Sequence, residues 1–265
     1  SEYILTCRQM GISILPPDIN EGAARFSVSN GSIRYALSAI KSIGRPVVEA
    51  IMEERRLGGK FKSLTDFLER MTGKEVNKRV VENLIKAGAL DSLGGTRQQY
   101  ILAYAGIMDS VAQSQKTMMT GQMSLFDLVD EDQKASFQAK LPDVGEYPKD
   151  HLLTFEKEVL GIYVSGHPLE EYEGRWRKNI TAVTTDFQLD EETNRTKVRD
   201  GQQVVVGGMI TGKTVKYTKN NRVMAFLQLE DLLGSVEVVV FPNIYEKNTQ
   251  QLNEEAKIFV SGHVD

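Results

Sequence analysis

The chain has 265 residues, of which 41% are hydrophobic and 26% charged, a composition typical of folded proteins with a substantial core. Its single cysteine, Cys7, excludes a disulfide framework and a cysteine-based zinc or iron–sulfur site. Its three histidines are too dispersed in sequence to indicate a metal cluster, so we expect no metal site. Because no run of 18 apolar residues occurs, we expect no membrane partner and a cytoplasmic location.

The formal net charge of −4 hides a strong asymmetry along the chain. Residues 34–97 contain 13 Lys and Arg against 8 Asp and Glu, whereas residues 118–171 contain 4 against 11. Binding responds to the local field, so a basic module followed by an acidic segment leaves nucleic-acid binding open.

Prolines 16 and 17 indicate an irregular stretch within residues 1–33. The region 34–112 has helical periodicity. The spacing predicts one helix whose first residues are 33–41. Pro46 is expected in the first turn of the next helix, which runs to about residue 56. Three further helices are expected: one capped by Ser63 or Thr65 and ending at Met71, one over 76–86, and one over 96–111.

Periodicity is lost over residues 113–150, which we interpret as an acidic linker, and a helical connector follows over 151–180. The last expected domain covers residues 181–265, and from about residue 202 the pattern changes to β-rich segments in the order β-β-β-α-β, with a glycine-interrupted first strand. That order is typical of an OB-fold. We therefore predict an α+β multidomain chain, in which an all-α tandem helix-hairpin-helix domain precedes an OB-fold β-barrel that lacks its last strand.

The first candidate binding element is the turn that contains Lys41, Ser42, Gly44 and Arg45. A tight turn before a helix leaves backbone N–H groups pointing outward, and these groups bind phosphate together with the helix dipole and basic side chains. Such contacts carry no sequence information. An ordinary turn between two helices remains the alternative, and Ser42 stands where a hairpin motif usually has glycine.

A second hairpin is expected around Lys86 and Gly88, and we include the basic Arg97 that follows it. Glycine after lysine is also a common helix C-cap, so a purely structural role stays open here.

Within the acidic linker, an apolar island is preceded by glutamine and flanked by polar residues. Leu125 and Phe126 can fill an apolar cleft on a partner, with Gln122 and Ser124 beside them, as in a short linear motif. The alternative is that the island packs on its own chain.

In the β-rich region, basic residues and a tyrosine surround the first hairpin, an arrangement typical of OB-folds that bind single strands. The candidates are Lys213, Lys216, Tyr217, Lys219 and Arg222. Phe226 and Phe241 are expected to be core residues, because most aromatic side chains in small barrels are.

No catalytic constellation is recognisable in the sequence. We expect Glu156 and Glu158 to lie on a solvated helix face and His167 to be structural. No residue is assigned a catalytic role, and no cofactor is expected.

Several segments, taken in order, resemble the bacterial replicative DNA polymerase III alpha subunit family over essentially the whole chain. They include the stretch Gly11–Asn20, the two hairpins, the apolar island, Ser165-Gly166-His167-Pro168-Leu169 and the β-rich end. The resemblance implies that residues 1–33 end a fingers region, 34–112 grip duplex DNA, 122–126 within the linker 113–150 bind the sliding clamp, and 181–265 lie near single-stranded template.

The resemblance also implies a parent enzyme that synthesises DNA on a template with Mg²⁺ in a palm domain. That domain is absent from this sequence, so this chain alone is expected to be inactive. The implied partners are double-stranded DNA, single-stranded DNA, the sliding clamp and other replicase subunits. The alternative function is an RNA-binding module, since OB-folds and basic helical hairpins also bind RNA.

Overall fold

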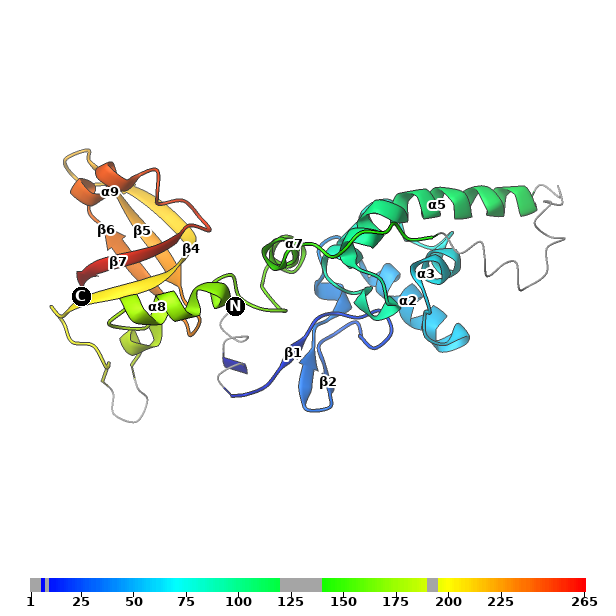
Figure 1. Ribbon diagram of the computed structural model, residues 1–265, viewed down its shortest axis with the longest axis horizontal. Coiled ribbons are helices and arrows are strands. Elements are labelled where there is room, and N and C mark those ends of the chain that lie inside the picture. The colour runs from blue at the N-terminus through cyan, green and yellow to red at the C-terminus, as the bar shows by residue number, and fades with distance from the viewer. Residues whose placement is uncertain (1–5, 8–9, 120–139, 190–194) are drawn as a thin grey trace. The chain divides into compact units, whose positions relative to one another are not determined.

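The computed structural model describes residues 6–7, 10–119, 140–189 and 195–265. The chain divides into two compact units: a helical unit of residues 11–166, and a second unit of residues 167–265 together with the first ten residues (Figure 1). The second unit contains a four-stranded antiparallel sheet, so the predicted α+β fold class is confirmed. Among the described residues, no helix is both long enough and apolar enough to cross a bilayer.

A small three-stranded sheet opens the helical unit, with strand order β1 (Ile14–Leu15), β3 (Ser32–Arg34), β2 (Ser27–Ser29). The predicted helix at residues 33–41 is therefore wrong at its start. The N–H groups of Ile33 and Tyr35 donate to carbonyls of residues 13 and 15, which ties this segment to β1. Helical structure begins only afterwards, as a single 3-10 turn, η1 (Leu37–Ala39).

Four helices follow where the periodicity predicts them: α2 (Arg45–Gly58), α3 (Leu64–Met71), α4 (Lys78–Lys86) and α5 (Arg97–Met119). Local signals set their ends. Pro46 lies in the first turn of α2, and the hydroxyl of Ser63 accepts from the N–H of Asp66 at the start of α3. The side chain of Asn77 caps α4 in the same way. The apolar faces of these helices share one core around Phe67, Leu84 and Tyr100.

Part of the expected linker belongs to the helical unit. Helix α5 continues to Met119, and residues 142–146 lie against its N-terminus, where Gln99 donates to the carbonyl of Pro142. Helix α7 (Lys149–Leu160) then adds Val159 and Leu160 to the core. The helical unit thus ends at Gly166, well beyond the expected boundary at residue 112.

In the second unit, η5 (Glu170–Tyr172), α8 (Glu173–Asn179) and η6 (Thr184–Phe187) precede the sheet. Its elements are β4 (Gln203–Tyr217), β5 (Val223–Glu230), β6 (Ser235–Val240), α9 (Pro242–Asn248) and β7 (Lys257–His263), and the strand order is β6-β5-β4-β7.

Strand β4 has 15 residues and pairs with β7 along its first half and with β5 along its second, with a register shift between Ile210 and Gly212. Glycine is required nearby, since a Cβ on Gly208 would lie 2.6 Å from the carbonyl oxygen of Glu230. The helix between the third and fourth strands matches the predicted order of an OB-fold without its last strand.

Candidate nucleic-acid interface

The turn between η1 and α2 is exposed at all four predicted binding residues, Lys41, Ser42, Gly44 and Arg45. Ser42 has a φ of 65°, so it adopts the left-handed conformation that usually favours glycine. The serine at this position therefore preserves the hairpin geometry, at some cost in backbone strain.

The turn presents several free backbone donors. The N–H groups of Ser42, Gly44, Arg45 and Val47 have no acceptor among the described residues, whereas that of Ile43 donates to the carbonyl of Ile40. These donors cluster at the N-terminus of the 14-residue helix α2, where the helix dipole favours negative charge. The geometry suits a phosphate group.

Two distant segments hold this turn in place. The N–H of Lys41 donates to the carbonyl of Val159 in α7 over 2.8 Å, and the side-chain amide of Asn83 in α4 donates to the carbonyl of Lys41 over 2.7 Å. Asn83 is only 7% exposed. Asn83 was not among the predicted binding residues, although a polar residue within the apolar stripe of α4 is a readable signal.

The charged side chains of the turn stay accessible. Arg45 pairs with Glu49 over 2.6 Å, but both side chains are more than half exposed, and surface pairs of this kind contribute little. Lys41 has no ion pair within the described part of the chain. Both cations can therefore reach an anion bound at the turn.

The second hairpin is committed to internal contacts. Lys86 pairs with Glu82 and Glu158, each at 3.0 Å. Burial lowers the pKa of Lys86, but the hydrogen bonds from the two glutamates outweigh it and hold the pKa above its ordinary value. Gly88 is buried, and its N–H donates to the carbonyl of Ile85. These placements argue against direct DNA contact here.

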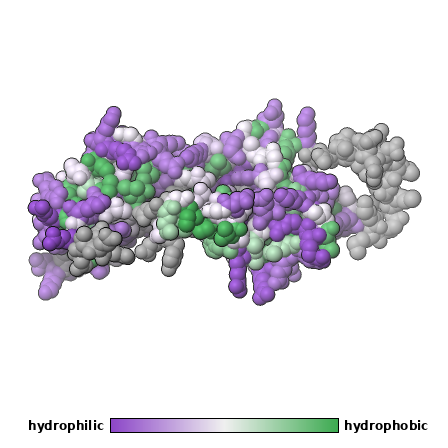
Figure 2. All heavy atoms as spheres, turned by 90° about the horizontal axis from the view of Figure 1, so that it is seen from below, coloured by the Kyte–Doolittle hydropathy of each residue, from purple (hydrophilic) through white to green (hydrophobic). Residues whose placement is uncertain are grey.

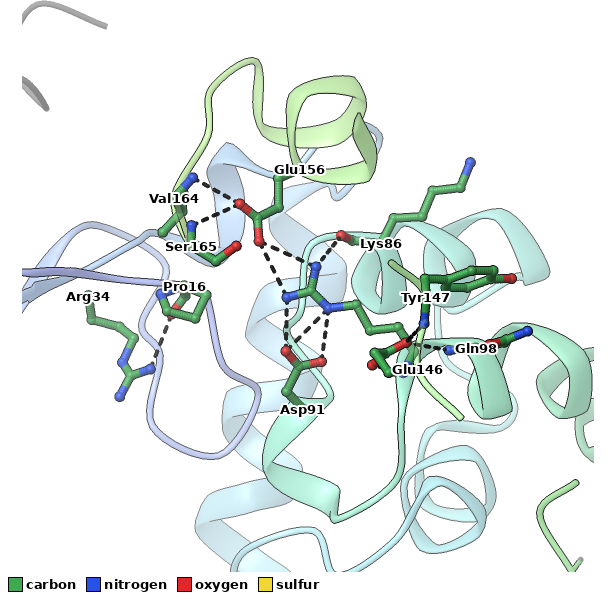
Figure 3. Close-up of polar contacts among 11 residues, drawn as sticks. Pro16, Arg34, Lys86, Asp91, Gln98, Glu146, Tyr147, Glu156, Val164 and Ser165 are labelled. Carbon is green, nitrogen blue, oxygen red and sulfur yellow. Dashed lines mark hydrogen bonds and ion pairs between the residues drawn. The ribbon is translucent and has the colours of Figure 1, made fainter. Parts of the chain in front are cut away.

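Arg97 is 4% exposed and belongs to a buried ion network instead of the surface. Its guanidinium pairs with Asp91 at 2.9 Å and with Glu156 at 3.3 Å. The other carboxylate oxygen of Glu156 accepts from the N–H groups of Val164 and Ser165, each over 2.9 Å (Figure 3). The prediction of a solvated Glu156 is wrong, since this residue is 0% exposed, and Arg97 has no face to offer a phosphate.

The Asp91 side chain is 45% exposed, yet its pKa is raised, because desolvation beside this network disfavours its charged form more strongly than Arg97 favours it. The segment before α7 contributes a further carboxylate at the start of α5. Glu146 accepts from the N–H groups of Arg97 and Gln98 over 2.8 and 3.1 Å, so it caps this helix (Figure 3).

In the second unit, two phenylalanine side chains that were expected in the core lie outside it. Ala225, Leu227 and Leu229 are buried, so Phe226 faces away from the core, and Phe241 is 64% exposed. The core assignment of both phenylalanines is wrong, because alternation on β5 selects the other row. Phe226 lies opposite Thr214 and Val239, and the ammonium of Lys216 is 4.6 Å from its ring centroid.

The other predicted single-strand-binding residues are distributed around this face. Tyr217 is 73% exposed at the end of β4, and Lys219 is exposed in the turn that comes after it. Lys213 lies over the ring of Tyr245, and Arg222 pairs with Glu246 at 3.0 Å. Tyr217 and Lys219 are thus exposed to solvent, whereas the cations of Lys213, Lys216 and Arg222 each lie against a side chain of this unit. Figure 2 shows apolar patches between hydrophilic side chains on the face of the molecule that it draws.

The predicted clamp-binding residues, 122–126, lie outside the described residues. Across the residues that are described, no group of three or more His, Cys, Asp or Glu side chains could hold a metal ion.

Comparison with known proteins connects both regions to nucleic-acid binding. A helix-hairpin-helix motif family matches residues 11–100, and an OB-fold nucleic acid binding domain family matches residues 204–265. Proteins named DNA polymerase III subunit alpha match nearly the whole chain. Those of Mycobacterium leprae and Vibrio cholerae are each 36% identical over 99% and 97% of it, and that of Thermus aquaticus is 36% identical over 100%.

The chain spans only 21–22% of the length of these relatives. The match nevertheless runs through both units, and it joins a helix-hairpin-helix region to an OB-fold in the order that the structure has. The resemblance found in the sequence is therefore confirmed: the chain is homologous to a part of the bacterial DNA polymerase III alpha subunit family.

Proposed function

We propose that this chain is the part of a replicative DNA polymerase that holds DNA without reading its sequence. The turn at residues 41–45 binds the phosphate backbone of the duplex, the OB-fold binds single-stranded template, and residues 122–126 bind the sliding clamp. The parent reaction is template-directed DNA synthesis, and this chain contributes binding and not chemistry.

The observation that carries the proposal is the cluster of unpartnered N–H groups at Ser42, Gly44, Arg45 and Val47, with Lys41 and Arg45 beside it. Donors at and just before a helix N-terminus suit the oxygens of a phosphate. Phosphate contacts carry no sequence information, and Lys41 and Arg45 neutralise phosphate charge, so the expected binding is independent of sequence and sensitive to salt.

The test is a salt titration of duplex binding. Replacing Lys41 and Arg45 by alanine should flatten the slope of log K against log salt by about two, one for each phosphate that is no longer neutralised. The double variant Lys62→Ala, Arg79→Ala removes the same charge from exposed positions elsewhere in the unit and should leave affinity closer to wild type. An unchanged slope in the first variant would refute binding at this turn.

For the OB-fold, the exposed ring of Phe241 and the half-buried ring of Phe226 support stacking with bases. Replacing both by alanine should weaken single-stranded DNA binding by about 1–3 kcal/mol per stacked base. Ile244→Ala, which removes a 56% exposed apolar side chain from α9, is the matched control. Tighter binding to structured RNA than to primed DNA of equal length would favour the alternative of an RNA-binding module.

Clamp binding rests on the sequence pattern at Gln122, Ser124, Leu125 and Phe126. Changing Leu125 and Phe126 to alanine should abolish capture by a purified sliding clamp and leave DNA affinity intact, whereas Leu128→Ala should retain capture. Unchanged capture by the first variant would mean that the island has another role.

A further inference from the structure

Helix α4 reaches the phosphate-binding turn through one buried amide. Asn83 is 7% exposed and lies among the apolar residues Val81, Leu84 and Ile85, which are all fully buried. Its Nδ2 donates to the carbonyl of Lys41 over 2.7 Å. Burying an amide without a partner costs about 1–3 kcal/mol, so this single contact accounts for an asparagine at a core position.

The contact also determines where a binding group points. The carbonyl of Lys41 and the N–H of Ser42 belong to the same planar peptide unit and point in opposite directions. Because Asn83 holds that carbonyl toward the interior, the N–H of Ser42 is directed outward, where it has no acceptor among the described residues. The bond from Lys41 to Val159 fixes the preceding peptide unit as well.

We propose that the second hairpin braces the first one instead of gripping DNA itself, with Asn83 as the positioning residue. This inference rests on the proposed function of the turn. The hairpin's own candidates support it: Lys86 is paired with two glutamates, Gly88 is buried, and Arg97 is held by two carboxylates. One hairpin presents phosphate donors, and the helix of the other sets the direction of the Ser42 N–H among them.

The test compares two buried asparagines in the full chain. Asn83→Leu keeps the side-chain size and removes the bond to Lys41. Asn20→Leu is the matched control, because Asn20 is 9% exposed and makes equivalent bonds to the backbone of Phe61. Both variants should lose thermal stability. At a temperature where both are folded, only Asn83→Leu should weaken duplex binding, by about tenfold, as expected for one charge-assisted hydrogen bond. Equal affinities of the two variants would overturn the proposal.

Amide NMR provides readouts that separate the brace from the binding. In the wild-type chain, added duplex should shift the signals of Ser42, Gly44 and Arg45 and leave Gly88 and Gln98 unchanged. Shifts at Gly88 and Gln98 would overturn the brace, and this measurement needs no variant to fold. Without DNA, Asn83→Leu should move or broaden the signals of Ser42 and Gly44. If neither signal changes, the proposal that Asn83 braces the turn is refuted, whether or not the turn binds DNA. If the wild-type chain has no DNA affinity, only the proposed function is contradicted.

Discussion

Replacement of Glu156 by alanine tests whether the buried ion network holds the helical unit together. This carboxylate is 0% exposed, and it accepts two backbone N–H bonds at 2.9 Å on one oxygen and the Arg97 guanidinium at 3.3 Å on the other. Alanine would leave Arg97 with a buried and partly uncompensated charge. It would also leave the N–H groups of Val164 and Ser165 without their acceptor.

The expected loss is large because breaking one partner of a buried ion pair costs about 3–5 kcal/mol. For a unit of this size, about 2–4 °C is lost for each kcal/mol, so the melting temperature should fall by roughly 6–20 °C. Glu156→Gln should also destabilise, since its NH₂ group must face either the guanidinium or the two N–H donors. No orientation of the amide satisfies both sides.

Urea denaturation of the wild-type chain and each variant gives the comparison. The matched control is Glu158→Ala, which removes a 49% exposed carboxylate two residues away on the same helix. Lys86 keeps its bond to Glu82 in that variant, so the change should stay within about 0.5 kcal/mol. If Glu156→Ala and Glu158→Ala prove equally stable, the assignment of a buried, fully bonded carboxylate is refuted.

Three further changes test single features of the helical unit. Glu146→Ala should lower stability by about 1 kcal/mol through loss of the α5 cap, whereas Asp143→Ala, an exposed acid without a hydrogen bond to the described residues, should not. Ser42→Gly should relieve the left-handed conformation and raise stability by up to about 1 kcal/mol, and a loss in urea denaturation would contradict that strain. Folding raises the pKa of Asp91. Above the ordinary pKa of about 3.9, the folded state therefore binds more protons than the unfolded state, and the contribution of this group to stability falls as pH rises. The stability of Asp91→Asn relative to wild type should therefore improve between that pH and neutrality, and a difference independent of pH would exclude this linkage.

Most secondary-structure elements were predictable because their signals are local. Ser63 and Pro46 mark helix starts, and the β-rich pattern after residue 202 indicates the strands of the sheet. The helix predicted from residue 33 failed because Ile33 also suits a strand, and pairing of β3 with β1 gives that segment its hydrogen bonds.

The burial of Glu156 and Arg97 and the position of Phe226 could not be predicted from local sequence patterns. Two charged residues on helices look solvated in sequence, yet they meet across 59 positions and neutralise one another inside the core. Phe226 was expected in the core, but Ala225 and Leu227 form the buried row of β5 and leave Phe226 on the opposite face.

By itself the sequence determined helices α2 to α5, the order of elements in the sheet, the family resemblance and the position of the turn at residues 41–45, because caps, periodicity and turn residues act over a few positions. Only the tertiary structure decided which charges stay available to a ligand. It buried Arg97, paired Lys86 and bonded Asn83 to the carbonyl of Lys41 next to Ser42, since burial and long-range hydrogen bonds depend on which segments the fold brings together.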